Sequence, residues 1–387
     1  MVDFDVVIIG GGIQGAGVAQ SAAADGYRVA LLEASGIGGA TSSKSSKLVH
    51  GGLRYLESAQ FGLVRQSLKE RQQLLRLAPG LVKLLPFYIP VYRHTSRRPW
   101  KIRLGLFLYT LLGGMSADTR YKKLNEPEQA VLAGLDKKQL QCVYRYFDAQ
   151  TDDRKLTRAV MESALSLGVE LLCPARFVRA QCNHDAVDVY YQQGHNRHAL
   201  KTRVLVNAAG PWVNNVLQLV EPQPDSLEVD LVQGAHIILD APPPDGIYYV
   251  EAPIDKRAVF IMPWYGNTMV GTTETLFTGG PQQVVPLPEE IDYLQQVYRN
   301  YFPGNPFRLL SSFAGLRVLP VDESSLFHRQ RDTIIHVAAS CPRVLSLYGG
   351  KLTSYRATSR KVIERLRAFL PAYEPKADVD SLVLSGD

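Results

Sequence analysis

The sequence predicts an α/β fold in which a parallel sheet, assembled from distant parts of the chain, is joined to a second domain built on an antiparallel sheet. Three observations predict this. An apolar, β-branched strand at 4–9 leads into a glycine turn and a helix. Strand patterns return at 204–210 and 344–348. Between them, the stretch 229–273 alternates apolar and polar residues, as antiparallel strands do.

The individual elements follow from hydrophobic periodicity and from Gly and Pro stop signals. Helices are expected at 16–25, 60–78, 153–167, 288–301 and from about 351 to 369. Strands are expected at 4–9, 28–33, 169–191 (a meander), 204–210, within 229–273, and at 344–348. The Gly- and Ser-rich stretch 36–52 is too long to be an idle loop in a compact domain.

The chain has 387 residues, enough for two or three domains. We expect the first domain to be discontinuous, because strands that belong to one parallel sheet lie far apart in the sequence. The predicted division assigns residues 1–80, 145–225 and 325–387 to the first domain. It assigns residues 81–144 and 226–324 to the second.

The turn after the first strand has the spacing Gly10-x-Gly12-x-x-Gly15, and the second strand ends in Glu33. Such glycines permit a tight turn, close approach of the backbone to a pyrophosphate, and close helix–strand packing. The helix N-terminus supplies backbone donors to phosphates, and the acid can accept hydrogen bonds from ribose hydroxyls. The motif predicts dinucleotide binding in a Rossmann-type domain, with a purely structural glycine turn as the alternative.

Two later segments favour FAD over NAD. The strand at 204–210 ends in small residues, as does the second motif of flavoproteins with two-dinucleotide folds. Glycines at 349–350 precede a helix whose N-terminus is suited to an electron-rich partner, such as the pyrimidine edge of a reduced flavin. Classical NAD dehydrogenases do not need the start, middle and end of the chain to converge on one cofactor.

The block from Ala40 to Glu57, which reads ATSSKSSKLVHGGLRYLE, resembles the signature of FAD-dependent glycerol-3-phosphate dehydrogenases. These belong to the D-amino-acid-oxidase-like flavoprotein superfamily. Further segments agree in order, at 207–212, 234–237, 262–264, 271–273, 315–317 and 348–356, so the resemblance covers essentially the whole chain. Three features differ: members usually continue into a C-terminal helical domain, Gln14 stands where Asn is frequent, and Glu274 stands where Asp is frequent.

The resemblance implies FAD and a role in glycerol metabolism. No His or Cys stands at a position suited to covalent attachment, so we expect FAD to bind non-covalently. The implied reaction is the oxidation of sn-glycerol 3-phosphate to dihydroxyacetone phosphate, with electrons passed to a quinone or another acceptor. Two alternatives stay open at this point. One is a flavin oxidase or dehydrogenase of another small hydroxy or amino acid, because one fold serves many substrates. The other is a flavin-binding protein without turnover.

A phosphate monoester needs cations, and oxidation of an alcohol needs a group that takes the hydroxyl proton, for which neutral His is suited. The residues implied for substrate binding and catalysis are His50, Arg54, Tyr55, His236, Arg317 and Lys351. Whether His50 is a base or a flavin contact is open. The residues implied for cofactor binding are Gly10, Gly12, Gly15, Glu33, Thr41, Ser42, Ser45, Ser46, Leu48, His50, Val178, Ala208, Gly210, Gly350, Lys351, Leu352 and Thr353.

The formal net charge is +6, which attracts anions of several kinds. We expect no nucleic-acid partner, because no basic–aromatic stripe or known module is present. The four cysteines have no CxxC spacing and no adjacent His cluster, so reduced thiols and no metal site are expected.

The fold begins at once with the first strand, so we expect no targeting segment and a cytoplasmic protein. The longest apolar run, 104–115, is too short to span a bilayer. Residues 92–112 join basic side chains to this run. They predict either an interfacial anchor on the inner face of the cytoplasmic membrane or a basic turn before a core helix.

Overall fold

The structure is a computed structural model that describes residues 1–321 and 333–386. The protein contains two sheets and the helices that cover them. The helices are α1 (Ile13–Ala24), α2 (Phe61–Leu77), α3 (Pro99–Leu112), α4 (Glu126–Ala130), α5 (Asp153–Ser166), α6 (Val213–Leu217), α7 (Pro288–Tyr301) and α8 (Tyr355–Leu366). Short 3-10 turns lie at Thr41–Ser43, Leu53–Leu56, Ala117–Thr119, Gly210–Trp212 and Pro281–Gln283.

The first sheet has nine strands and a parallel centre. Its members are β1 (Phe4–Ile9), β2 (Val29–Leu32), β7 (Glu170–Leu172), β8 (Arg176–Cys182), β9 (Val187–Gln193), β10 (Asn196–Asn207), β11 (Val220–Glu221), β18 (Ile334–Val337) and β19 (Val344–Tyr348). Strand β1 pairs in parallel with β10 and β2, β10 with β19, and β2 with β7. The start, middle and end of the chain therefore meet in this sheet, as expected.

The second sheet has ten strands and is largely antiparallel. Its members are β3 (Leu48–Val49), β4 (Val82–Tyr92), β5 (Lys122–Lys123), β6 (Leu140–Thr151), β12 (Val229–Asp240), β13 (Ile247–Glu251), β14 (Ala258–Trp264), β15 (Asn267–Gly271), β16 (Thr275–Phe277) and β17 (Arg308–Pro320). Its longest pairings are β12 with β17 and β4 with β6.

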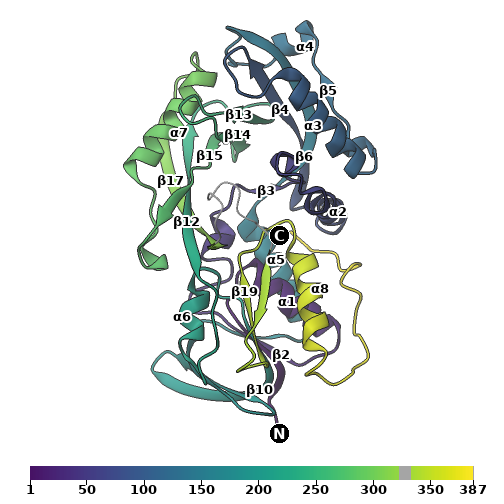
Figure 1. The fold of residues 1–387 in the computed structure, drawn as a ribbon, viewed down its shortest axis with the longest axis vertical. Helices are drawn as coiled ribbons and strands as arrows, with labels where there is room; N and C mark the ends of the chain where they lie inside the picture. The colour runs from purple at the N-terminus through teal and green to yellow at the C-terminus, as the bar shows by residue number, and fades with distance from the viewer. Residues whose placement is uncertain (322–332, 387) are drawn as a thin grey trace.

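Figure 1 shows the two sheets as two stacked lobes. The lower lobe carries β2, β10 and β19 with α1 and α8, and the upper lobe carries β4, β13, β14 and β15 between α7 and α3. Strand β1 is apolar almost throughout because both faces of the parallel sheet are covered, one by α1, α5 and α8 and the other by the β8–β9 meander and α6. Short β3 extends the antiparallel sheet toward the lower lobe, so the segment around it joins the two.

The expected helices at 60–78, 153–167 and 288–301 are confirmed within two residues at each end. Two helix starts are corrected. Helix α1 begins at Ile13, not at residue 16, because Gly12 is its N-cap and Gly15 lies inside its first turn. Helix α8 begins at Tyr355 rather than directly after Lys351, because residues 351–354 form a turn, and it ends at Leu366 rather than at about residue 369.

Strands β4, β6 and β17 were not expected. Strand β4 contains Pro86 and Pro90, which indicate an edge strand or no strand at all. It nevertheless lies inside the sheet, between β6 and β13. The prolines are tolerated because β4 pairs along its length with β6 but meets β13 only at Phe87 and Tyr88. The division into domains stays a prediction, but its boundary at 144/145 falls inside β6, which pairs in the second sheet along its whole length. The boundary at 324/325 lies outside the described residues.

Candidate active site

The glycine turn after β1 is as tight as the motif requires. Gly10 has φ +105°, and a Cβ atom there would lie 2.6 Å from the carbonyl oxygen of Ala208, at the end of β10. A Cβ atom on Gly15 would lie 1.9 Å from the carbonyl oxygen of Gly10. Only glycine fits at either position, so the turn brings the N-terminus of α1 close to the ends of both parallel strands.

Glu33 lies against this turn. One carboxylate oxygen accepts a hydrogen bond from the backbone N–H of Gly11 at 2.7 Å. The other accepts from the backbone N–H groups of Ser35 and Gly36 at 2.7 and 3.1 Å. The acid thus fixes the loop after β2 beside the glycine turn, and its contact with a ribose stays a prediction.

The segment 41–57, which carries eight of the 21 predicted residues, runs from this turn to the antiparallel sheet. Ser42 Oγ accepts a hydrogen bond from the backbone N–H of Ile13 at 2.9 Å, at the start of α1. Thr41 Oγ1 donates to the carbonyl of Leu316 in β17 at 3.0 Å. Ser46 Oγ lies 2.9 Å from Nε2 of His236. Three of the predicted hydroxyls therefore tie together elements from both lobes.

Two buried ionic networks hold this segment, and the sequence did not reveal either. Lys47, with φ +60°, donates from Nζ to Asp153 at 2.6 Å, and the same carboxylate accepts two bonds from Ser45. On the other side, Asp148 pairs with the fully buried Arg71 at 2.9 Å and accepts from the backbone N–H of Gly51 at 3.3 Å. Buried charges need such partners, so both networks fix the segment's path.

The remaining predicted cofactor residues lie around these elements. Ala208 and Gly210 follow β10, and Gly210 has φ +55°. Leu48 is buried in β3, Thr353 is buried before α8, and Leu352 packs on the core of the first sheet. Val178 lies in β8, three residues after Ala175, whose backbone N–H donates to the carbonyl of Glu33 at 2.7 Å, and its contact with the cofactor stays a prediction. It occupies a bulge in β8, where the register with β9 shifts.

Cations gather around the ring of Tyr55. Lys351 Nζ lies 4.2 Å from the ring centroid, and the Arg54 guanidinium lies 5.5 Å from it. Burial alone would raise the pKa of the Tyr55 phenol, but the nearby charges of Lys351, Arg54 and Arg317 outweigh it and lower this pKa. Three predicted cations from distant parts of the chain therefore act on one point, which suits a dianionic ligand.

Arg317 is oriented by an acid. Its Nη1 donates to Glu274 at 2.9 Å, and Arg257 binds the other oxygen of that carboxylate at 2.5 Å. The Arg317 side chain is 29% exposed, so the guanidinium is held by protein yet remains reachable. Burial is the main cause that lowers the pKa of the Arg317 guanidinium, and the negative charge of Glu274 acts in the opposite direction. Gly234 leaves room for it, since a Cβ atom there would lie 3.1 Å from Nη2.

Both predicted histidines are neutral at physiological pH. Desolvation, with help from Arg54 and Lys351, lowers the pKa of His50 to about 3. Desolvation, with help from Lys47 and Arg317, lowers the pKa of His236 to about 3 as well. His236 is stacked on Phe313 at 4.9 Å between centroids, whereas His50 meets the edge of Phe260 at 6.3 Å. A neutral imidazole is the form that accepts a proton.

Three buried polar atoms here have no hydrogen-bond partner within the described ranges: Gln14 Oε1, Lys351 Nζ and His236 Nδ1. Each such atom costs roughly 1–3 kcal/mol unless something else satisfies it. An amide and a cation at the start of α1, with an imidazole on β12 beside Ser46, fit a dinucleotide cofactor whose ring edges carry donors and acceptors. Over the same described residues, no group of three His, Cys, Asp or Glu is placed to hold a metal ion, and all four cysteines are free thiols.

The pH dependence of turnover follows from the histidine environments. Because the pKa of His50 lies near 3, the imidazole stays neutral as the pH falls through its ordinary value of about 6.5. We expect the limiting rate of substrate oxidation, measured at saturating substrate, to be flat between about pH 5 and pH 8. Stopped-flow absorbance checks this. A sigmoidal loss of rate with a midpoint near 6.5 would contradict the low pKa of His50.

Comparison with known proteins gives one family and several similar chains. The family model described as FAD dependent oxidoreductase matches residues 5–356. A glycerol-3-phosphate dehydrogenase of Pseudomonas aeruginosa is 36% identical over 385 residues, which cover 97% of this chain and 74% of that one. The aerobic glycerol-3-phosphate dehydrogenase of Escherichia coli is 34% identical, with 99% and 77% covered. D-erythritol 1-phosphate dehydrogenase of Brucella abortus is 35% identical, with 95% and 74% covered.

Solved structures agree in fold. The glycerol-3-phosphate dehydrogenase of Bacillus halodurans complexed with FAD has a TM-score of 0.78 and 25% identity, covering 99% of this chain and 68% of that one. The L-alpha-glycerophosphate oxidase of Mycoplasma pneumoniae, with FAD bound, has a TM-score of 0.76 at 18% identity, covering 96% of both chains. At that identity the second likeness speaks for the fold alone.

Proposed function

The chain belongs to the FAD-dependent oxidoreductase family, and from this premise we propose that it oxidises sn-glycerol 3-phosphate to dihydroxyacetone phosphate. The observation that carries the proposal is the cluster of Arg54, Arg317 and Lys351 around Tyr55, next to two neutral histidines. Relatives at 34–36% identity that bear the name glycerol-3-phosphate dehydrogenase support the same substrate.

The residues around the glycine turn would hold the cofactor. Gly10, Gly12 and Gly15 admit a pyrophosphate at the N-terminus of α1, and Glu33 stands beside it for a ribose. Segment 349–353 brings Lys351 to the same region. FAD, when bound, supplies the two-electron acceptor for the substrate's carbon-bound hydrogen, and a quinone or another acceptor then receives the electrons.

The chain's own side chains bind and orient the substrate. Arg317 and Arg54 hold the phosphate, and Lys351 adds a third positive charge. His50, neutral and half-buried, accepts the proton of the secondary hydroxyl as the alcohol becomes a ketone. His236 is held by Ser46 and Phe313 at the wall of the site, where it positions the substrate.

A substrate panel separates this function from its alternatives. One arginine is enough for a single carboxylate, whereas three cations favour a phosphate dianion. We expect anaerobic reduction by sn-glycerol 3-phosphate and none by small hydroxy or amino acids at equal concentration. D-erythritol 1-phosphate belongs in the panel, because it shares the phosphate group. Reduction by an amino acid, with no effect of phosphate esters, would move the chain to the alternative. Bound flavin that no substrate reduces would indicate a protein without turnover.

We also propose contact with a membrane through α3. Over the described residues, no helix is long and apolar enough to cross a bilayer. Helix α3 nevertheless exposes Trp100, Leu104, Phe107 and Leu111, each at least half accessible. Their spacing of four, three and four residues puts them on one face, about 16 Å long. Exposed Lys101 and Arg103 favour an anionic surface, such as the inner leaflet of the cytoplasmic membrane, from which a quinone could be reached.

Substitution on this face tests the contact. We expect Phe107→Ser with Leu111→Ser to abolish sedimentation with vesicles that contain phosphatidylglycerol, since two exposed apolar anchors are lost. Leu276→Ser with Val285→Ser is the matched control, because these side chains are 51% and 62% exposed and lie far from α3 in the fold, Leu276 in β16 at the other end of the strand order from β6 and Val285 just before α7. Binding of the wild type should also fall as salt is raised. If both pairs of substitutions weaken sedimentation equally, α3 is not the anchor.

A further inference from the structure

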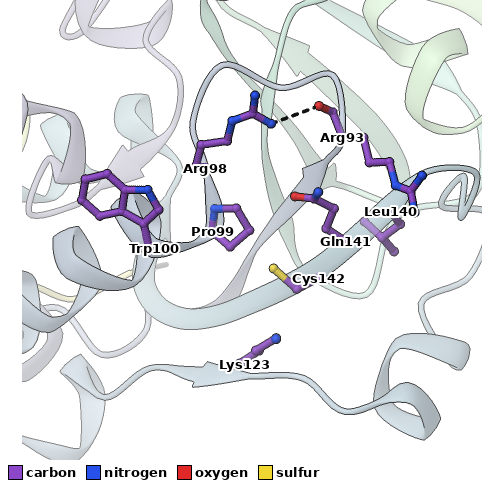
Figure 2. A pocket seen from close by; sticks show the side chains of 8 residues that line it. All are labelled: Arg93, Arg98, Pro99, Trp100, Lys123, Leu140, Gln141 and Cys142. Carbon is purple, nitrogen blue, oxygen red and sulfur yellow. Dashed lines mark hydrogen bonds between the residues drawn. The ribbon is translucent and has the colours of Figure 1, made fainter.

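A hollow of about 580 Å³ opens on the upper lobe where α3 begins beside β5 and β6. Figure 2 shows its lining: Arg93 and Arg98 come from the loop between β4 and α3, Lys123 from β5, and Trp100 from the first turn of α3. Cys142 and its neighbours in β6 form the floor. None of these residues belongs to the candidate active site, so the hollow needs its own explanation.

The hollow is positively charged and lacks a compensating acid. Arg93, Arg98 and Lys123 all line it, and no Asp or Glu does. Throughout the described part of the chain, none of the three forms an ion pair; the Arg98 guanidinium donates only to the backbone carbonyl of Arg93, at 3.4 Å. By contrast, the neighbouring Lys122 is paired with Glu128 at 2.6 Å. Three uncompensated charges around one concave surface attract an anion.

The hollow is continuous with the apolar face of α3. Trp100 lines the hollow and is also the first residue of the exposed stripe that continues through Leu104 and Phe107. Tryptophan is enriched at the level of lipid head groups, where one side of the ring is apolar and the other is wet. In the membrane contact proposed above, a basic hollow at that level would face the phosphates of the lipid head groups.

We propose that this hollow binds the phosphate of an anionic phospholipid head group. Arg93 and Arg98 supply planar donors for the phosphate oxygens, and Lys123 closes the opposite side as a point charge. The inference rests on the membrane contact proposed above, and it gives that contact a head-group preference. It does not depend on which substrate the enzyme oxidises.

The test uses the full-length flavoprotein and calorimetric titration with dihexanoyl phosphatidylglycerol below its micelle concentration, with inorganic phosphate as the second probe. We expect Arg93→Gln with Arg98→Gln to weaken lipid binding about tenfold or more, which corresponds to about 1.4 kcal/mol or more, because the phosphate loses two planar charged donors. The matched control is Arg65→Gln with Lys69→Gln, which removes two exposed charges from α2 in the same lobe but outside both the hollow and the α3 face. We expect that control to bind the lipid as the wild type does.

Equal weakening by the two pairs would overturn the proposal, because it would reduce the effect to general surface charge. Binding of inorganic phosphate as tight as that of the lipid would overturn the lipid assignment. Anaerobic reduction of the flavin is measured on the same three proteins. If the wild type binds the lipid but sn-glycerol 3-phosphate does not reduce its flavin, only the proposed reaction is contradicted. If the flavin is reduced but the lipid binds no better than inorganic phosphate, only the proposed head-group site is contradicted.

Discussion

Arg317→Ala is expected to raise the substrate concentration needed for half-maximal flavin reduction by about 10- to 150-fold while FAD stays bound. The guanidinium lies within electrostatic reach of Tyr55 and Arg54, and Glu274 holds it at 2.9 Å. A charge-assisted bond to phosphate contributes roughly 1.5–3 kcal/mol, and about 1.4 kcal/mol corresponds to tenfold. The residue lies on β17 and is not part of the glycine turn, so the visible flavin spectrum of the purified variant should match that of the wild type.

The same strand offers a matched control for this variant. Arg308 begins β17, its side chain is 76% exposed, and it pairs with Asp240 at the surface. Arg308→Ala should leave the concentration dependence of flavin reduction within about twofold of the wild type, as surface ion pairs contribute little. An unchanged apparent affinity in Arg317→Ala, with glycerol 3-phosphate as substrate, would remove Arg317 from the phosphate site.

Gly15→Ala is expected to yield protein that purifies without flavin. The new methyl group would lie 1.9 Å from the carbonyl oxygen of Gly10, and neither backbone can yield without moving α1 away from β1. Overpacking of this kind typically costs about 1–3 kcal/mol of stability. It also opens the turn that is expected to hold the pyrophosphate. Flavin content per protein, measured by absorbance after denaturation, checks the prediction.

Alanine variants at two other glycines show how the loss of flavin depends on the space around the new methyl group. Gly36→Ala is the control, since a Cβ atom there meets nothing within 4 Å and the glycine lies in the loop after β2. Gly12→Ala is intermediate, because its Cβ atom would meet only the hydroxyl of Ser42 at 3.1 Å. Circular dichroism separates loss of cofactor from loss of fold. Full flavin content in a folded Gly15→Ala variant would show that the turn does not carry the cofactor.

The cofactor turn was predictable from the sequence because its chemistry is local. The spacing of Gly10, Gly12 and Gly15 and the acid at Glu33 follow from one strand, one turn and one helix. The structure moved the start of α1 by three residues, since the glycines that make the turn also cap the helix. Patterns that depend on neighbouring residues alone survive folding with small changes of this kind.

The partners of buried charges were not predictable, because they come from distant segments. Lys47 looks like an ordinary basic residue of a polar loop, yet it is 5% exposed and paired with Asp153 at the start of α5. Glu274 was noted only as a departure from the family, and its role appears when Arg257 and Arg317 converge on it. Strand β4 was not predicted because it contains two prolines. The sheet tolerates them because β4 pairs along its length only with β6.

The most direct test of the account is anaerobic titration of the purified flavoprotein with sn-glycerol 3-phosphate, followed in the visible flavin band. We expect rapid bleaching of the band and formation of dihydroxyacetone phosphate in equal amount to the flavin reduced. Flavin that stays oxidised at saturating substrate, in protein that is folded and fully loaded with FAD, would contradict the proposed reaction.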